Sequence, residues 1–198
     1  MRQFWDKRFS NDDYAYGLEP NDFFRETIDK LNPGKLFLPG EGEGRNAVYA
    51  ATKGWEVTAV DFSMKARDKA LKLAKEMDTD IKYQVSSLEA YAYEKEKYDA
   101  IGLIYVHFPP LVRKKVHKNI LSALKPGGTL IVEAFHKDQY WNDSGGPKNK
   151  DMLYNFITLR TDFSGMNYEF TKEIEVDLNE GLYHQGQAHI VRMLATKK

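Results

Sequence analysis

The stretch KLFLPGEGEGRNA, residues 35–47, decides the fold of this chain. Its apolar first part predicts a buried strand, and the small and apolar residues from Ala47 onward predict a helix. Between the two, the chain must reverse sharply at the end of a strand and let a ligand approach the backbone, and only glycine permits both. Gly40, Gly42 and Gly44 meet that requirement. The stretch therefore predicts the strand, glycine turn and helix that open a nucleotide-type α/β domain.

Strands and helices alternate outward from this turn. The patterns predict further strands over 57–61, 81–85, 98–106 and 129–134, and helices over 21–31, 63–77 and 112–124. Such alternation implies right-handed βαβ units. The last third departs from it, because strands predicted over 168–178 and 188–196 are too close in sequence for a crossover helix. We predict a Rossmann-like α/β fold with a seven-stranded, mainly parallel sheet, a C-terminal antiparallel hairpin and helices on both faces.

Length and composition predict one domain and exclude several classes of site. The chain has 198 residues, and we divide it into an N-terminal lid or helical segment (1–31), a cofactor-binding core (35–135), a polar surface loop (136–150) and a C-terminal helix and hairpin (151–198). It contains no cysteine, which excludes disulfides and thiolate metal sites. No apolar run approaches the roughly 20 residues of a membrane span, so we expect a cytoplasmic protein.

The residues around the glycine turn indicate which kind of cofactor it binds. Arg45 stands where dinucleotide-binding proteins have a third glycine, and Glu41 and Glu43 would repel a pyrophosphate. A sulfonium cofactor is positively charged and meets no such repulsion. Asp61 ends the second strand, where a carboxylate accepts ribose hydroxyls, and Phe62 follows to cover the adenine. In the alternative interpretation Asp61 only caps the next helix and Phe62 belongs to the core.

These segments resemble the class I S-adenosylmethionine (SAM)-dependent methyltransferases. Residues 40–47 are close to the first motif of that family, and residues 124–130 are similar to the turn before its fifth strand. Residues 5–9 and 14–21 resemble the tellurite-resistance and thiopurine methyltransferase-like branch, whose leader folds over the cofactor.

The resemblance implies SAM as cofactor, S-adenosylhomocysteine as product and a set of binding residues. These residues are Gly40, Glu41, Gly42, Gly44, Arg45, Asp61, Phe62, Ser87, Leu88, Tyr105 and Tyr16. Two positions depart from the family pattern. Leu38 replaces the acid that opens the first motif, and Ser87 stands near the place of the acid that ends the third strand.

The acceptor should meet residues that follow the carboxyl ends of the parallel strands. Candidate catalytic residues are His107, His184 and Glu133, although each histidine also has a plain structural interpretation. The chain has 29 basic and 29 acidic residues, a balance that disfavours a nucleic-acid substrate and favours a small-molecule acceptor. We also expect no metal, and a monomer or homodimer. The competing functions are a catalytically silent SAM-binding module and a nucleotide-linked oxidoreductase.

Overall fold

The structure, a computed structural model, describes residues 2–198 and contains one seven-stranded sheet with the order β3-β2-β1-β4-β5-β7-β6. The strands are β1 (Lys35–Pro39), β2 (Glu56–Asp61), β3 (Lys82–Val85), β4 (Tyr98–Ile104), β5 (Leu124–Phe135), β6 (Asn167–Glu180) and β7 (His184–Thr196). The first five are parallel, and β7 runs antiparallel to both β5 and β6. The predicted Rossmann-like sheet with its C-terminal hairpin is confirmed.

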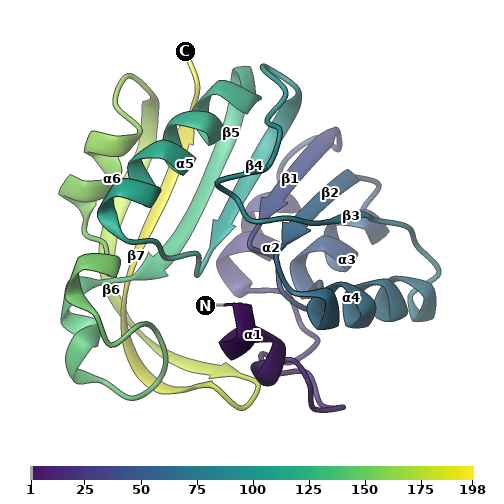
Figure 1. The fold of residues 1–198 in the computed structure, drawn as a ribbon. Coiled ribbons are helices and arrows are strands. Elements are labelled where there is room, and N and C mark those ends of the chain that lie inside the picture. Colours follow the sequence, from purple (N-terminus) through teal and green to yellow (C-terminus); the bar gives the residue numbers. More distant parts are fainter. Residues whose placement is uncertain (1) are drawn as a thin grey trace.

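Helices cover both faces of the sheet (Figure 1). Leu36 and Leu38 of β1 pack on one side with residues of α2 and α3, whereas Phe37 packs on the other with residues of α5 and α6. This alternation follows from the two-residue period of a strand and explains why β1 is apolar throughout. The helices are α2 (Asp22–Ile28), α3 (Arg45–Thr52), α4 (Met64–Glu76), α5 (Pro110–Ala123) and α6 (Phe156–Asp162).

Three of the predicted strands are longer in the structure than their sequence patterns indicated. The hairpin strands are longer than expected, and only residues 181–183 join β6 to β7. β5 begins at Leu124, so much of the stretch 124–130, which was expected to form the turn before the fifth strand, belongs to an irregular start of that strand. In each case backbone pairing with a neighbouring strand overrides the local signal of polar residues or glycine. The first predicted helix is shorter, because α2 is capped by Asn21 and ends at Ile28.

The loop that follows β5 is anchored on its inner side, although its polar composition predicted only a surface loop. It contains two short 3-10 helices, η1 (Lys137–Trp141) and η2 (Lys150–Met152). Gln139 and Ser144 are buried, and Ser144 Oγ donates to the carbonyl oxygen of Gln187 in β7 at 2.6 Å. These contacts hold the loop against the hairpin.

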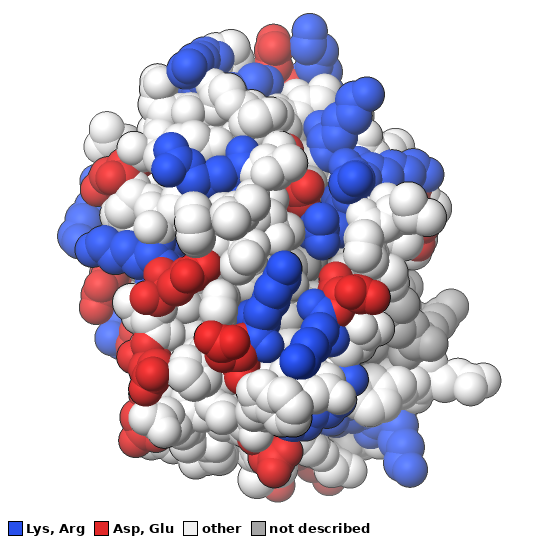
Figure 2. Space-filling view, turned by 90° about the vertical axis from the view of Figure 1, so that its left-hand side faces the viewer, with Lys and Arg blue, Asp and Glu red and all other residues white. Residues whose placement is uncertain are grey.

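Charges of both signs alternate over the face drawn in Figure 2, where no broad field of one sign appears. This mixture agrees with the balanced composition of the chain. Within residues 2–198, none of the helices combines the length and the apolar character needed to cross a bilayer.

Candidate functional site

The glycine turn adopts the backbone conformation that its sequence predicts. Gly40, Gly42 and Gly44 have φ angles of 72°, 65° and 90°, in the left-handed region where other residues are strained. A Cβ on Gly44 would lie 2.6 Å from the Cβ of Ala70 in α4, and a Cβ on Gly40 would lie 2.9 Å from the side chain of Val106 after β4. The turn therefore needs glycine for its conformation and for close packing against its neighbours.

Asp61 joins this turn to the end of β2. One carboxylate oxygen accepts the backbone N–H of Gly42 at 3.3 Å, and the other accepts the N–H of Ser63 at 2.9 Å. Burial raises the pKa of Asp61 to about 6, although these hydrogen bonds act to lower it. Ser63, not Asp61, caps α4, because its Oγ accepts the N–H of Ala66. The capping alternative for Asp61 is thus wrong, and its carboxylate faces the glycine turn.

Glu41 is a second buried acid on the same turn. Its Oε1 accepts the N–H of Ala47 at 2.7 Å and so caps the first turn of α3. Burial nevertheless raises the pKa of Glu41 to about 7, because its effect exceeds the lowering by this hydrogen bond and by the charge of Arg45. Two desolvated carboxylates therefore flank the turn, an environment that favours hydroxyl donors or a cation and disfavours a phosphate.

Glu43 does not face the turn, and in this respect the electrostatic argument from sequence was wrong. Its carboxylate accepts the N–H of Ala15 at 2.7 Å and forms an ion pair with Lys69 of α4. Lys69 also donates to the carbonyl oxygens of Asn11 and Asp13. The pair anchors the N-terminal leader, residues 2–21, so of the two glutamates in the turn only Glu41 would repel a pyrophosphate.

The leader lies over the carboxyl edge of the sheet, where α1 (Arg2–Arg8) is drawn below the strands in Figure 1. Ser63 Oγ donates to Asp6, and Phe9 is buried against Gly42, because a Cβ there would be 3.4 Å from the Phe9 ring. Leu182 in the hairpin turn donates its N–H to the carbonyl oxygen of Ala15 at 3.0 Å. The leader thus contacts both the glycine turn and the hairpin.

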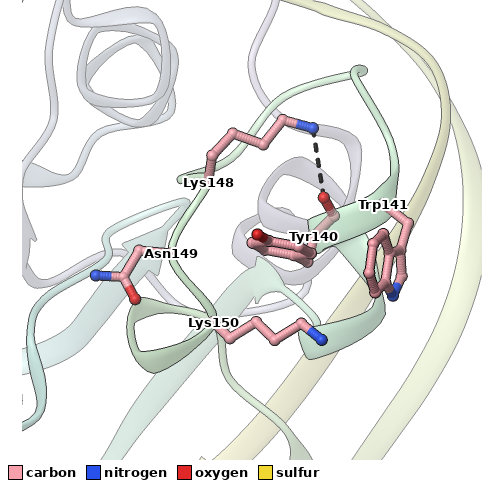
Figure 3. A pocket seen from close by; sticks show the side chains of 5 residues that line it. All are labelled: Tyr140, Trp141, Lys148, Asn149 and Lys150. Carbon is pink, nitrogen blue, oxygen red and sulfur yellow. Dashed lines mark hydrogen bonds between the residues drawn. The ribbon is translucent and has the colours of Figure 1, made fainter.

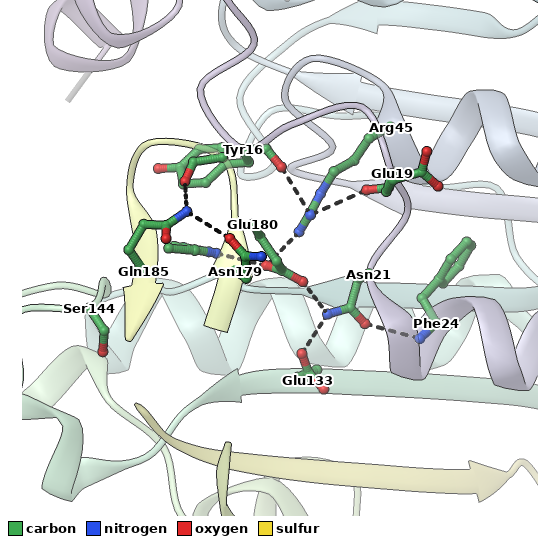
Figure 4. Close-up of polar contacts among 12 residues, drawn as sticks. Tyr16, Glu19, Asn21, Phe24, Arg45, Glu133, Ser144, Asn179, Glu180 and Gln185 are labelled. Atoms are coloured by element: carbon green, nitrogen blue, oxygen red, sulfur yellow. Dashed lines mark hydrogen bonds and ion pairs between the residues drawn. The ribbon is translucent and has the colours of Figure 1, made fainter. Parts of the chain in front are cut away.

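Arg45, predicted to bind the cofactor, instead holds the leader to the hairpin (Figure 4). Its guanidinium donates to the carbonyl oxygens of Tyr16 and Glu19 at 3.1 and 3.4 Å. It also forms an ion pair of 3.0 Å with Glu180 at the end of β6. Both terminal nitrogens are therefore bonded within the protein. His184 and Arg45 hold the pKa of Glu180 at about 2 although burial acts to raise it.

Glu133 also has a structural role rather than the catalytic one considered from sequence. One of its carboxylate oxygens accepts the Asn21 amide at 2.6 Å, and the other pairs with Arg192 of β7. Asn21 in turn donates to Glu180 and caps α2 by accepting the N–H of Phe24 (Figure 4). Both oxygens of this buried acid therefore hold the leader and β7 in place.

The two candidate histidines differ in their hydrogen bonds. His107 Nδ1 lies 2.7 Å from the carbonyl oxygen of Met152, and its Nε2 accepts the N–H of Phe135 at 3.2 Å. Both nitrogens are therefore bonded to backbone, and burial lowers the pKa of His107 to about 4. This side chain fixes the loop after β5. His184 Nδ1 lies 2.9 Å from a Glu180 oxygen, and none of the described residues forms a hydrogen bond with its Nε2.

The other predicted cofactor residues lie around the same edge with different exposure. Phe62 is partly exposed and belongs to none of the buried clusters of the described chain, which leaves its ring available to a ligand. Ser87 is exposed, but Leu88 is buried in the core beneath β1 and β4. The Tyr16 ring lies 4.5 Å from that of His184. Tyr105 follows β4, and its hydroxyl is buried without a hydrogen-bond partner among residues 2–198.

A cavity of about 520 Å³ lies within the loop after β5 (Figure 3). Its lining consists of Tyr140, Trp141, Lys148, Asn149 and Lys150. Lys148 donates to the Asn142 carbonyl oxygen and Asp143, and the Lys150 ammonium lies 4.8 and 4.6 Å from the rings of Tyr140 and Trp141. Both cations are thus used inside the loop. Across residues 2–198 no cluster of histidine and acidic side chains has the arrangement of a metal site.

Residues 39–128, from the end of β1 to the start of β5, match the methyltransferase domain family. No curated protein matches the sequence. Among solved structures, one concerned with conversion of a disulfide bond into a thioacetal group during echinomycin biosynthesis has a TM-score of 0.81 at 14% identity, covering 100% of this chain and 92% of that one. TehB from Haemophilus influenzae gives 0.76 at 18% identity, covering 100% and 67%.

A third structure is the N-methyltransferase NodS from Bradyrhizobium japonicum WM9 in complex with S-adenosyl-L-homocysteine. It gives a TM-score of 0.67 at 15% identity and covers 100% of this chain and 98% of NodS. At these identities the likeness shows a shared fold. The chain therefore has the fold of the SAM-dependent methyltransferases.

Proposed function

We propose that this protein is a SAM-dependent methyltransferase that acts on a small molecule, within the tellurite-resistance and thiopurine methyltransferase-like branch. The observation that carries the proposal is the carboxylate of Asp61 at the end of β2, held against a turn of three left-handed glycines. The match to the methyltransferase domain and the likeness to a structure with bound S-adenosylhomocysteine support it. The similarity to TehB supports the branch.

The residues present fit SAM better than a dinucleotide. In this proposal Asp61, at the end of β2 beside the glycine turn, accepts the ribose hydroxyls, and the partly exposed Phe62 covers the adenine. Glu41 offers a desolvated carboxylate near the turn for a cationic ligand. It would take the role of the acid that Leu38 replaces. Ser87 would serve through its hydroxyl or backbone. When bound, SAM supplies an electrophilic methyl group and leaves as neutral S-adenosylhomocysteine.

The protein's own contribution is positioning and exclusion of water. The leader covers the glycine turn and contacts the hairpin through Ala15 and Leu182, so its undocking would admit ligands and its docking would enclose them. A monomer or homodimer and a cytoplasmic location remain predictions. A silent SAM-binding module would share every feature named so far except turnover.

Calorimetry with SAM, S-adenosylhomocysteine and NAD⁺ tests the proposal. We expect the first two to bind and Asp61→Asn to weaken them by roughly tenfold or more, since hydrogen bonds to charged groups contribute about 1.5–3 kcal/mol. Asp68→Asn is the matched control, because Asp68 is exposed on α4 and pairs only with Arg67 among the described residues. Binding of NAD⁺ without SAM would contradict the proposal. Release of S-adenosylhomocysteine with a panel of acceptors separates an enzyme from a silent module.

A further inference from the structure

The tip of the β6–β7 hairpin contains an oriented histidine. The hairpin register pairs Glu180 with His184, and the three-residue turn 181–183 brings their side chains together. His184 Nδ1 donates to the Glu180 carboxylate at 2.9 Å, which fixes the tautomer that leaves a lone pair on Nε2. The His184 side chain is 6% exposed. Glu180 is itself held by Arg45 and Asn21, so the carboxylate that orients the ring cannot easily turn away.

The Nε2 side of this ring is left without a protein partner among residues 2–198. A Cβ on Gly145 would lie 3.3 Å from Nε2, so the glycine keeps a side chain away from that atom. The ring is bordered by Tyr16 at 4.5 Å, Tyr105 at 4.6 Å and Phe135 at 5.2 Å between centroids. These aromatic neighbours keep water away from the free nitrogen.

A second unsatisfied polar group lies beside it. The hydroxyl of Tyr105 is buried without a hydrogen-bond partner among the described residues, which is costly for a polar group. Tyr105 also has a φ of 55°, a strained conformation for a bulky side chain at the carboxyl end of β4. Burial and the charge of Glu133 raise its pKa, so the phenol stays protonated as a donor. Strain and an unpaired hydroxyl at a strand end indicate a ligand-binding role.

We propose that His184 is the general base of this methyltransferase, oriented by Glu180, and that the acceptor is a small phenol whose hydroxyl hydrogen-bonds with Tyr105. This inference rests on the function proposed above. As the acceptor O–H bond breaks, its proton moves to Nε2 of His184, and the electron pair of that bond becomes available to bond the methyl carbon. The imidazolium then returns the proton to solvent when the leader undocks.

The charges facing His184 explain why a phenol is favoured. Burial lowers the pKa of His184, and the charge of Arg45 lowers it as well. The carboxylates of Glu180 and Glu133 act in the opposite direction and raise this pKa. His107, after β4, faces the same side and is neutral. A neutral imidazole is a suitable base for a weakly acidic phenol but a poor one for an alkyl alcohol. A metalloid oxyanion or a thiolate already carries the lone pair and needs no base.

Nitrogen-15 NMR of histidine-labelled protein saturated with S-adenosylhomocysteine tests the inference directly, with phenol as the probe. The His184 signals are assigned from the loss of peaks in His184→Gln. We expect Nδ1 to be protonated and Nε2 bare at neutral pH, and we expect phenol to shift the Nε2 resonance. A protonated Nε2, or an Nε2 that phenol leaves unchanged, overturns the inference. A shift with benzylamine but not with phenol overturns the acceptor class.

Kinetics provide a second readout. His184→Gln should lower phenol methylation roughly 10²–10⁴-fold, the usual contribution of a general base, with unchanged affinity for S-adenosylhomocysteine. Glu180→Gln should move the acidic limb of the pH–rate profile to lower pH, because loss of the carboxylate charge lowers the pKa of His184. His189→Gln is the matched control, since His189 lies on the same strand with a side chain 30% exposed. Full activity of His184→Gln contradicts the inference.

The two proposals fail in distinguishable ways. If the unmodified protein binds neither SAM nor S-adenosylhomocysteine, the proposed function itself is wrong. If the protein binds SAM and S-adenosylhomocysteine but phenol does not shift the Nε2 resonance, only the proposed role of His184 is wrong.

Discussion

The glycine turn after β1 and the hairpin tip beyond β5 lie at the same edge of the sheet, but different interactions hold them in place. The turn is defined by backbone: three glycines with positive φ, and hydrogen bonds from backbone N–H groups to Asp61 and Glu41. The hairpin tip is defined by polar and charged side chains that come from the leader, α3, β5 and both hairpin strands. A site made by backbone is local in sequence, whereas one made by side chains depends on the whole fold.

The largest effect is expected from breaking the side-chain network at Arg45. Arg45→Met leaves the buried carboxylate of Glu180 without its cation and two leader carbonyls without a donor. Removing one member of a buried pair typically destabilises a protein by roughly 3–5 kcal/mol. Urea unfolding measures the loss, and Arg25→Met is the control, because its pair with Asp22 is exposed and should contribute under about 1 kcal/mol. Equal losses in the two variants would show that the network adds no stability.

The backbone-defined side is tested by Gly44→Ala. The added Cβ would be strained by a φ of 90° and would lie 2.6 Å from Ala70 Cβ, so we expect a destabilisation of roughly 2–4 kcal/mol. Gly165→Ala separates the two causes, since Gly165 has a φ of 88° and a Cβ added to it would meet no described atom within 4 Å. That variant should lose only about 1 kcal/mol. A Gly165→Ala loss as large as that of Gly44→Ala would assign the effect to strain alone.

A smaller and more local effect is expected where leader and hairpin touch. A Cβ on Gly181 would lie 2.6 Å from the carbonyl oxygen of Ala15, so Gly181→Ala should push the leader off the hairpin. We expect a loss of roughly 1–3 kcal/mol together with faster proteolysis within residues 2–21. Gly186→Ala, at a φ of 93° with open space around it, should leave the leader protected. Unchanged cleavage in Gly181→Ala would argue against a detachable lid.

The smallest effect concerns pH. The pKa values of about 6 for Asp61 and about 7 for Glu41 are raised, so these acids bind protons more tightly in the folded chain than in the unfolded one. Their contribution to stability is present at low pH and is lost as pH rises through about 4 to 7. A cationic cofactor favours the ionised carboxylates, so binding at pH 6 should release protons and tighten as pH rises to 7. Calorimetry in buffers of different ionisation enthalpy measures this release, and proton uptake would contradict the account.

The sequence predicted the backbone-defined side well. Glycine spacing, strand apolarity and an acid at the end of β2 are local signals, and they placed Gly40, Gly42, Gly44 and Asp61 correctly at one edge. The same logic supplied the order of elements, because βαβ units and a closing hairpin follow from periodicity and connection length.

The side-chain-defined region was largely hidden from the sequence. Asn21 bonds to Glu133, 112 residues away in the sequence, and to Glu180, 159 residues away. Nothing in the local sequence marks these residues, or Arg192, as partners. Arg45 was assigned to the cofactor site, and Glu43 was expected to repel a pyrophosphate there, because both neighbour the glycines. Both side chains instead turn toward the leader. Glu180, four residues before His184, was the one available signal, and it was missed because the predicted hairpin strand ended at Leu178.

A crystal structure of the protein with S-adenosylhomocysteine tests the central claim most directly. The account predicts the nucleoside at the turn Gly40–Gly44, with both ribose hydroxyls on the Asp61 carboxylate and the adenine against Phe62. A nucleoside bound elsewhere, with Asp61 still bonded only to the N–H groups of Gly42 and Ser63, would contradict it.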